Sequence, residues 1–243
     1  MNQKGKEEMN VSIPNKHYLP YHIGIIVDGT RRWAKEKRLP TYAGHQKGAE
    51  RIEEIVKYAC DLGIKIITIY TFFIENWKRE EKEVSYLFQL FETYARNKME
   101  EVNALKIQVR IIGDLQGLPD SLNEILTKMV TLTRSNEKMI VNLALNYGGR
   151  NELVRTFQKL LLINVSASTI TEELINNNLD TAGLPDPDLI IRTSGEQRLS
   201  NFLPWQATYS ELYFTKVHWP DFDKKQLEIA LEEFQQRQRR MGK

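Results

Sequence analysis

The chain has 243 residues, of which 41% are hydrophobic and 27% are charged, and its formal net charge at pH 7 is +2. A net charge this small gives no general basic surface, so we expect no nucleic-acid partner. Cys60 is the only cysteine, which excludes an internal disulfide framework and a cysteine-rich zinc site.

The first ten residues are polar, and no apolar run approaches the roughly 20 residues that a membrane-spanning helix needs. We therefore expect a cytoplasmic protein and leave a peripheral contact with a membrane open. Pro14 and Pro20 interrupt any regular element near the start, which predicts a flexible N-terminal tail at residues 1–19. Residues 20–243 show no linker and are expected to form a single domain.

Six short apolar runs after the tail are predicted to be β-strands. Most are continuously apolar, which is typical of strands that are covered on both faces. Stretches with helical spacing lie between them, and this alternation predicts an α/β fold with a central, mainly parallel six-stranded sheet surrounded by helices. The predicted strands are residues 22–27, 65–72, 107–112, 139–145, 188–193 and 211–214.

Three of the intervening stretches have clear helical patterns. In residues 47–63 the apolar side chains recur at the three-to-four spacing of one buried face, and Gly63 is a typical helix end. Residues 80–103 form a second amphipathic pattern, and residues 223–240 form a third that ends in a basic cluster. In open α/β sheets, ligands bind beyond the carboxyl ends of the strands, so the residues there are the first candidates for a site.

The first strand ends in Asp28 and Gly29, which are followed by Thr30, Arg31 and Arg32. Glycine lets the backbone approach an anion closely, and guanidinium groups are forked donors for phosphate oxygens. A carboxylate beside a phosphate repels it unless a divalent metal ion lies between them. The turn is therefore a candidate phosphate and metal site, and the alternative is a solvated turn whose arginines form surface ion pairs.

Polar residues follow two further strands. The second strand is followed by Glu75, Asn76, Trp77 and Arg79, and the fifth carries Arg192, with Ser194, Glu196, Arg198 and Ser200 beyond it. Each of these residues has another interpretation. The acids would be helix caps and the tryptophans would be packing residues, while His45 would be a histidine near the core whose hydrogen bonds are satisfied. Because parallel strands end at one edge of a sheet, five arginines there predict two phosphorylated groups and a metal ion.

At these segments the chain resembles the cis-prenyltransferases, the undecaprenyl diphosphate synthase family, from about His22 to Arg239. The motifs are HIGIIVDGTRRWA, GHQKG, ENWKR, RIIGD, NYGGR, DPDLIIRTSGEQRLSNF and YSELYFTKVHWPDF. The resemblance implies a homodimer in which the sheet and its helices enclose an apolar tunnel. It also implies a Mg²⁺-dependent condensation of isopentenyl diphosphate with an allylic diphosphate, giving a Z-configured polyprenyl diphosphate.

The resemblance further implies roles for individual residues. Asp28 would hold Mg²⁺ and help the allylic diphosphate to leave, Glu211 would be a second metal-linked acid, and Asn76 would assist proton removal. The other residues would contact substrate. The allylic diphosphate would be bound by Gly29, Thr30, Arg31, Arg32 and His45, and isopentenyl diphosphate by Arg192, Arg198, Ser200 and the loop residue Arg79. The substrate entrance would be walled by Trp33 and Trp77, and the neighbouring wall would be formed by Phe73 and Glu75.

The chain departs from the usual family pattern at six positions. They are Thr30 for asparagine, Thr41 for arginine, Phe73 and Ile74 for small hydroxyl residues, Glu80 for proline and Pro204 for leucine. The change at Phe73 removes a hydrogen-bond partner and adds bulk, and the change at Thr41 removes a cationic contact. Binding and ionisation of an allylic diphosphate remain compatible with these changes.

Three functions are therefore considered. The first is a conventional synthase that elongates prenyl chains. The second is an atypical member that makes an irregular (branched) or cyclised short terpenoid from prenyl diphosphates. The third is a non-catalytic subunit, and the presence of Asp28, Arg192, Arg198 and Glu211 argues against it.

Overall fold

The computed structural model describes residues 19–237. Its centre is one six-stranded sheet with the strand order β3-β4-β2-β1-β5-β6, and every pairing is parallel. The strands are β1 (His22–Ile26), β2 (Ile66–Phe73), β3 (Ile107–Ile112), β4 (Met139–Tyr147), β5 (Leu189–Arg192) and β6 (Glu211–Phe214). The predicted α/β fold is confirmed, with each strand within two residues of its expected bounds.

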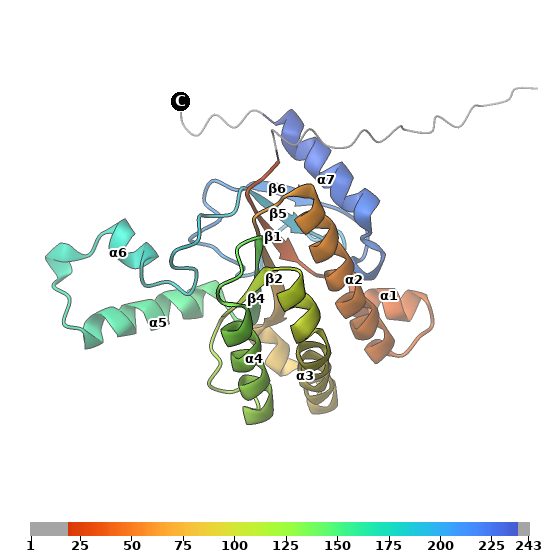
Figure 1. The fold of residues 1–243 in the computed structure, drawn as a ribbon, viewed down its shortest axis with the longest axis horizontal. Helices are drawn as coiled ribbons and strands as arrows, with labels where there is room; N and C mark the ends of the chain where they lie inside the picture. The colour runs from red at the N-terminus through yellow and green to blue at the C-terminus, as the bar shows by residue number, and fades with distance from the viewer. Residues whose placement is uncertain (1–18, 238–243) are drawn as a thin grey trace, which may run out of the picture.

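Seven α-helices and three short 3₁₀ helices connect and flank these strands (Figure 1). The α-helices are α1 (Thr30–Glu36), α2 (Thr41–Leu62), α3 (Glu81–Ala104), α4 (Asp120–Thr133), α5 (Gly149–Leu162), α6 (Glu172–Asn176) and α7 (Lys224–Gln236). The 3₁₀ helices are η2 (Ile74–Lys78), η3 (Ala167–Thr169) and η4 (Trp219–Asp221). Helix α2 begins earlier than its apolar pattern predicted, because its first turns carry Thr41 and Gly44 in place of large apolar residues.

The two faces of the sheet have different covers. On one face, α2 and α7 pack against side chains such as Ile23 and Ile25, and α3 and α4 continue this layer over β3 and β4. Side chains of opposite parity, such as Ile26 and Ile190, face the other way and contact the loop residues Phe202 and Leu203. Both faces are thus buried, as the continuous apolar runs predicted.

Helices α5 and α6 form an arm that projects from the layered body of sheet and helices in Figure 1.

None of the helices within residues 19–237 combines the length and the apolar character needed to cross a membrane. The predicted tail (1–19) lies almost entirely outside the described residues, as does the end of the predicted helix (223–240) with Arg239 and Arg240.

A buried chain of hydrogen bonds links β1, β2 and β4 on the second face of the sheet. His22 is 1% exposed; its Nδ1 donates to the carbonyl oxygen of Pro185 at 2.7 Å, and its Nε2 accepts from the Thr68 hydroxyl at 2.7 Å. The amide of Asn142 donates to the same hydroxyl oxygen at 3.2 Å. Burial lowers the pKa of His22 from 6.5 to about 4, against the opposing effects of Pro185 and Asp188.

This histidine predicts a loss of stability in mild acid. The unfolded chain binds a proton to His22 below about pH 6.5, whereas the folded chain binds it only below about pH 4, so stability falls as the pH falls between these values. The expected loss is about 2–3 kcal/mol between pH 7.5 and 4.5. Urea unfolding of the protein and of His22→Gln measures it. A variant with the same pH dependence as wild type would contradict the prediction.

Candidate active site

The backbone at the end of β1 is fixed by hydrogen bonds from two distant segments. The Asp28 carbonyl oxygen accepts from the Thr193 hydroxyl at 2.7 Å and from the Trp219 backbone N–H at 3.0 Å. The Asp28 N–H donates to Thr193 Oγ1 at 3.0 Å. The following residue, Gly29, has φ +100°, and a Cβ atom there would lie 2.4 Å from Ser194 Oγ. Only glycine fits this position, which places the Asp28 side chain at the carboxyl edge of the sheet.

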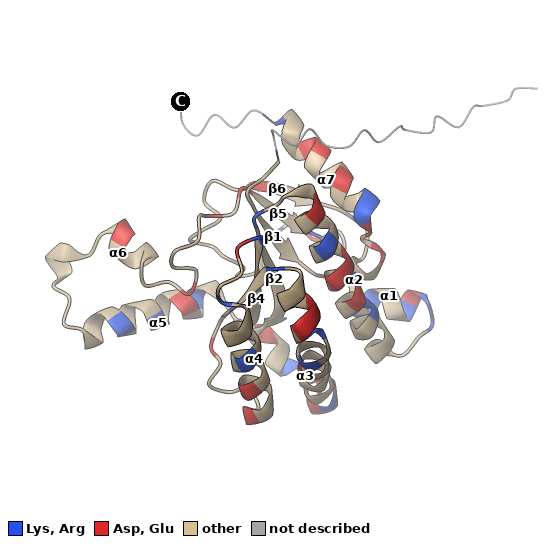
Figure 2. Cartoon of the chain, in the orientation of Figure 1, with Lys and Arg blue, Asp and Glu red and all other residues tan. Residues whose placement is uncertain are grey.

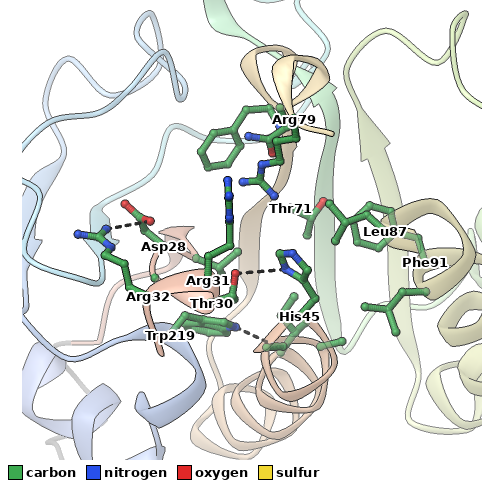
Figure 3. A pocket seen from close by; sticks show the side chains of 18 residues that line it. Asp28, Thr30, Arg31, Arg32, His45, Thr71, Arg79, Leu87, Phe91 and Trp219 are labelled. Carbon is green, nitrogen blue, oxygen red and sulfur yellow. Dashed lines mark hydrogen bonds and ion pairs between the residues drawn. The ribbon is translucent and has the colours of Figure 1, made fainter. Parts of the chain in front are cut away.

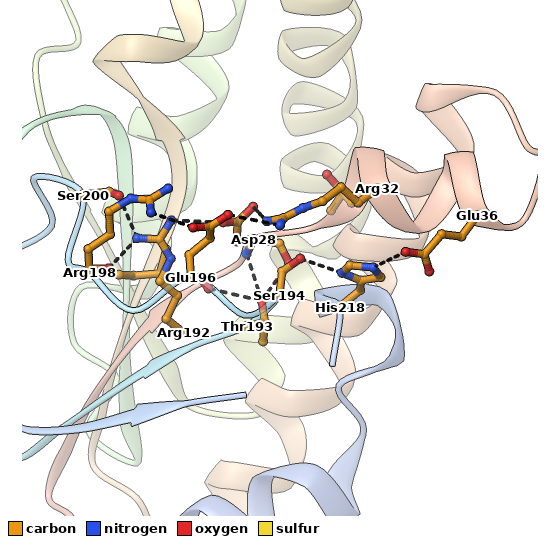
Figure 4. A network of polar contacts seen from close by, with 12 residues as sticks. Asp28, Arg32, Glu36, Arg192, Thr193, Ser194, Glu196, Arg198, Ser200 and His218 are labelled. Carbon is orange, nitrogen blue, oxygen red and sulfur yellow. Dashed lines mark hydrogen bonds and ion pairs between the residues drawn. The ribbon is translucent and has the colours of Figure 1, made fainter. Parts of the chain in front are cut away.

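The Asp28 carboxylate lies between two guanidinium groups (Figure 4). Arg32 approaches Oδ1 at 3.1 Å, and Arg192 approaches Oδ2 at 3.0 Å. Arg192 ends β5, where it pairs in register with Ile26 of β1, so the parallel pairing itself brings it to the acid. The predicted meeting of Asp28 with arginines at one edge is therefore seen.

Arg192 also holds the loop at residues 198–200 by hydrogen bonds. Its side chain is 3% exposed, and its Nη1 donates to Ser200 Oγ at 2.7 Å and to the Arg198 carbonyl oxygen. Its buried Nε has no hydrogen-bond partner within residues 19–237. Arg198 itself pairs with Glu196 at 2.6 Å, and Glu196 also contacts Arg32 at 3.2 Å. Acidic and basic groups therefore alternate from Arg198 to Asp28.

A histidine closes the outer end of the same network. The Nδ1 atom of His218 lies 2.6 Å from Ser194 Oγ, and its Nε2 lies 3.0 Å from Glu36 Oε1 (Figure 4). A Cβ atom at Gly29 would lie 2.6 Å from His218 Nδ1, so the ring packs directly on the turn that carries Asp28. His218 therefore joins the turn at 193–195 to helix α1.

A second cationic cluster surrounds one acid of α3, and Figure 3 shows its members Arg31, His45 and Arg79 around one pocket. Glu83 Oε1 contacts Arg79 at 3.1 Å, His45 Nε2 at 3.0 Å and Arg31 at 3.8 Å. His45 Nδ1 lies 3.2 Å from the Thr30 hydroxyl. Burial lowers the pKa of His45, partly opposed by the hydrogen bond to Glu83, so the ring is neutral at pH 7 and its Nε2–H donates to Glu83.

Thr30, Arg31, His45 and Arg79 of this cluster border a cavity of about 330 Å³ whose lining is polar at Asp28 and becomes apolar toward α3. A second cavity of about 160 Å³ is almost entirely apolar and lies between α2, α3 and the sheet. The residues that line both cavities are Ala49, Ile52, Thr71, Leu90 and Phe91. Polar chemistry at the sheet edge and apolar space behind it are thus adjacent.

The first cavity brings together most of the predicted site residues. Those that line it are Asp28, Gly29, Thr30, Arg31, Arg32, His45, Phe73, Asn76 and Arg79. A register shift in β2 between Tyr70 and Phe73 marks a bulge, and the Phe73 ring stacks on Tyr70 with the centroids 3.7 Å apart. Asn76 Oδ1 accepts from the Phe73 N–H at 3.1 Å.

Seven predicted residues do not line this cavity: Trp33, Glu75, Trp77, Arg192, Arg198, Ser200 and Glu211. The Trp33 indole donates to Asp221 at 2.8 Å, and the Trp77 indole donates to Asn146 at 2.7 Å while its ring packs against phenylalanines. Glu75 is exposed and accepts from Asn201 at 3.3 Å. Neither tryptophan lines the cavity, and the expectation that the two wall its entrance stays a prediction.

Glu211 lies away from Asp28 in the sheet. It begins β6 and pairs in register with Leu189 at the start of β5, whereas Asp28 follows the other end of β1. Its carboxylate forms an ion pair with Arg237 at 2.9 Å. In one chain Glu211 and Asp28 therefore lie at opposite edges of the sheet, and the metal role of Glu211 stays a prediction.

Sequence reasoning missed Glu83, Thr193 and His218. Glu83 could have been found from its position four residues after Arg79, because residues at that spacing meet on a helix surface. Thr193 and His218 act through backbone and turn contacts that no spacing signals. No cluster of three or more His, Cys, Asp or Glu that could hold a metal ion occurs in residues 19–237.

Comparison with known proteins identifies the family. A family described as "Putative undecaprenyl diphosphate synthase" matches residues 26–242. An isoprenyl transferase of Clostridium tetani is 42% identical, covering 98% of this chain and 94% of the relative. An isoprenyl transferase of Streptococcus pneumoniae is 45% identical, covering 98% of this chain and 97% of the relative.

Two solved structures share the fold. Lavandulyl diphosphate synthase from Lavandula x intermedia, in complex with dimethylallyl diphosphate, superposes with a TM-score of 0.90 at 35% identity, covering 93% of this chain and 100% of that one. A probable undecaprenyl diphosphate synthase from Campylobacter jejuni superposes with a TM-score of 0.78 at 29% sequence identity, and the match covers 92% of this chain and 99% of that one. The motifs, the sheet topology and the relatives agree, and the chain belongs to the undecaprenyl diphosphate synthase family of prenyltransferases.

Proposed function

We propose that the protein elongates prenyl chains by condensing isopentenyl diphosphate with an allylic prenyl diphosphate to a Z-configured product. The observation that carries this proposal is that Asp28 and arginines of the clusters around Arg192 and Glu83 line one cavity, whose lining becomes apolar toward α3. The full-length relatives at 42–45% identity are named isoprenyl transferases, whereas the lavandulyl synthase is 35% identical. The branched or cyclised alternative is therefore not favoured.

Each diphosphate is proposed to bind residues of both cationic clusters. Arg31 and Arg32 on the first turn of α1, with Thr30 and His45, would bind the allylic diphosphate. Arg192 and Arg198, with Ser200 and the loop residue Arg79, would bind isopentenyl diphosphate. Guanidinium groups suit this task because their planar forks match phosphate oxygens and stay charged at all working pH values.

The reaction breaks the carbon–oxygen bond of the allylic diphosphate, and the bonding electrons leave with the diphosphate. The double bond of isopentenyl diphosphate then attacks the electron-poor allylic carbon, and loss of one proton restores a double bond. Arginines held at fixed positions favour the first step because negative charge grows on the oxygens that they contact. Asn76 is proposed to assist proton removal by orientation, since its Oδ1 already accepts the Phe73 N–H.

The residues at Asp28 fit a Mg²⁺ ion that is shared with the substrate. Mg²⁺ prefers one or two carboxylates, water and phosphate oxygens, and Asp28 offers a carboxylate beside the diphosphate-binding arginines. Asp28 would hold the ion, which when bound would offset negative charge on the leaving diphosphate. In its absence, Arg32 and Arg192 balance the charge of Asp28.

The growing hydrocarbon requires an apolar path away from the diphosphates. The two cavities share five lining residues and extend from the sheet edge between α2 and α3. We propose that they form one tunnel for the prenyl chain. Burial of each methylene in such a path is favourable by about 0.8 kcal/mol, which draws the chain inward as it grows.

The projecting arm supports a homodimer. Helix α5 and the residues after it expose apolar side chains to an unusual degree: Val154 53%, Phe157 43%, Leu161 71%, Leu162 83% and Ile163 61%. A contiguous apolar surface of this kind marks an interaction site, and a second copy of the chain is the proposed occupant. Cytoplasmic location and peripheral membrane contact also remain proposals; Arg237 of the basic C-terminal cluster is already paired with Glu211.

Asp28→Asn should abolish most activity, because it removes the negative charge while keeping the shape of the side chain. We expect kcat/KM to fall about 10²–10³-fold. Mass spectrometry of products from farnesyl diphosphate, isopentenyl diphosphate and Mg²⁺ measures it, with the exposed Asp120→Asn as a matched control. Activity of Asp28→Asn within a few-fold of wild type would rule out the proposed role, and a wild-type protein without a five-carbon product ladder would rule out the function.

Arg192→Lys tests the assignment of the second diphosphate site. Lysine keeps the charge but cannot contact Asp28, Ser200 and the loop carbonyl together. We expect the KM for isopentenyl diphosphate to rise about tenfold or more, with a smaller change for the allylic substrate. Steady-state kinetics decide this, and the exposed Arg150→Lys is the control. A change confined to the allylic substrate would reverse the assignment.

Substitutions that place charged side chains on the apolar arm test the proposed dimer. Phe157→Glu combined with Leu161→Glu should convert a dimer to a monomer in sedimentation velocity at micromolar concentration, because two buried carboxylates would face the partner's apolar surface. Leu132→Glu, which changes an exposed leucine of α4, is the matched control and should stay dimeric. A monomeric wild type, or a dimeric double variant, would contradict the proposed interface.

A further inference from the structure

The apolar cavity between α2 and α3 has four charged residues in its lining. They are Glu53 and Lys57 on α2, and Lys98 and Glu101 on α3. The rest of the lining consists of apolar and aromatic side chains and one threonine, supplied mainly by the two helices, by Leu126 and Met129 of α4, and by β2, β3 and β4. The charged residues therefore interrupt an otherwise apolar wall at one place.

These four residues form a closed ring of ion pairs, which we call the ionic clasp. Within the helices, Lys57 contacts Glu53 at 2.7 Å and Lys98 contacts Glu101 at 3.0 Å. Between the helices, Lys98 contacts Glu53 at 2.9 Å, and Lys57 contacts Glu101. Each charge thus has two partners of opposite sign, and two of the four contacts tie α2 to α3.

The four groups carry full charge at neutral pH. Hydrogen bonds to Lys57 and Lys98 lower the pKa of Glu101, and hydrogen bonds to Glu101 and Glu53 raise the pKa of Lys57. The side chains are 27–40% exposed, so water and salt reach the clasp from outside while its inner side borders the cavity. Figure 2 shows that both signs of charge occur along α2 and α3.

The clasp lies in the part of the cavity that is far from Asp28. The two cavities meet at Leu90 and Phe91 on α3, and Lys98 follows Leu90 by eight residues, which is about 12 Å of helix. Beyond it the lining continues to Val102 and Leu105. A hydrocarbon chain that grows away from Asp28 meets the clasp only after it has filled the first cavity.

Ion pairs at this place limit how far α2 and α3 can separate. An apolar chain cannot replace the water or the partner of a charged group, so it cannot pass outward between the helices without parting the ion pairs. We propose that the ionic clasp holds α2 and α3 together over the far half of the tunnel and thereby limits the length of the prenyl product. This inference rests on the proposed function and adds the group that sets product size.

The test compares two sets of substitutions at the clasp. Glu53→Gln, Lys57→Met, Lys98→Met and Glu101→Gln together remove all four charges at nearly constant volume. Glu53→Lys, Lys57→Glu, Lys98→Glu and Glu101→Lys together reverse every charge and restore the alternation. The control is Lys47→Met with Glu50→Gln, which removes an ion pair of 2.9 Å on α2 that does not line either cavity.

Product lengths are measured by mass spectrometry with farnesyl diphosphate and excess isopentenyl diphosphate. The neutral variant should raise the share of products longer than the main wild-type product about tenfold, whereas the reversed variant and the control should keep the wild-type distribution. Wild type should also shift toward longer products between about 0.05 M and about 1 M salt, and the neutral variant should not. A neutral variant with the wild-type distribution would overturn the proposal.

A binding measurement separates failure of the clasp from failure of the proposed function. Calorimetry gives the affinity for linear alkyl phosphates of increasing chain length, which requires no turnover. Affinity should rise about fourfold for each buried methylene and then stop rising at a fixed length. The neutral variant should move that limit to longer chains. An unmoved limit overturns the clasp even if wild type makes the expected ladder, and a moved limit supports it even if wild type makes none.

Discussion

The architecture of the site depends on one interaction, the contact of the Asp28 carboxylate with Arg32 and Arg192 at the carboxyl edge of the sheet. Clustered arginines repel one another, so the fold must supply negative charge where no diphosphate is bound. Asp28, Glu196 and Glu83 supply it, each in contact with two or more basic side chains. We infer that diphosphate binding is an exchange in which phosphate oxygens take over contacts that these carboxylates now make.

The exchange is effective only if an inner part of the site stays fixed while the outer arginines move. Asp28 meets this condition through its backbone, because the Thr193 hydroxyl and the Trp219 N–H hold it on both sides. Arg192 meets it through burial and through its contacts with the loop at 198–200. Arg32 and Arg198 are 43% and 61% exposed and are free to reorient. The rigid pair Asp28 and Arg192 is therefore flanked by two exposed arginines, of which Arg32 contacts Asp28 and Arg198 contacts Glu196.

The sheet and its edge were predictable from local patterns, whereas the cross-chain contacts were not. Continuous apolar runs located the strands, and the rule that ligands bind beyond strand ends selected Asp28 and Arg192. The same rule does not apply to Glu211, which begins a strand, and only the resemblance suggested a metal role for it. His218 and Thr193 escaped detection because their contacts depend on how the turn after β5 packs on α1, which no periodic pattern encodes.

Helix α3 explains how events at the sheet edge relate to those in the apolar interior. Its first turn carries Glu83 in the cationic cluster, its middle carries Leu90 and Phe91 where the cavities meet, and its later turns carry Lys98 and Glu101 in the ionic clasp. A continuous helix transmits displacement along its axis, because its backbone hydrogen bonds resist local bending. Release of Glu83 from Arg79 by an arriving diphosphate would therefore act on the same helix that carries half of the ionic clasp.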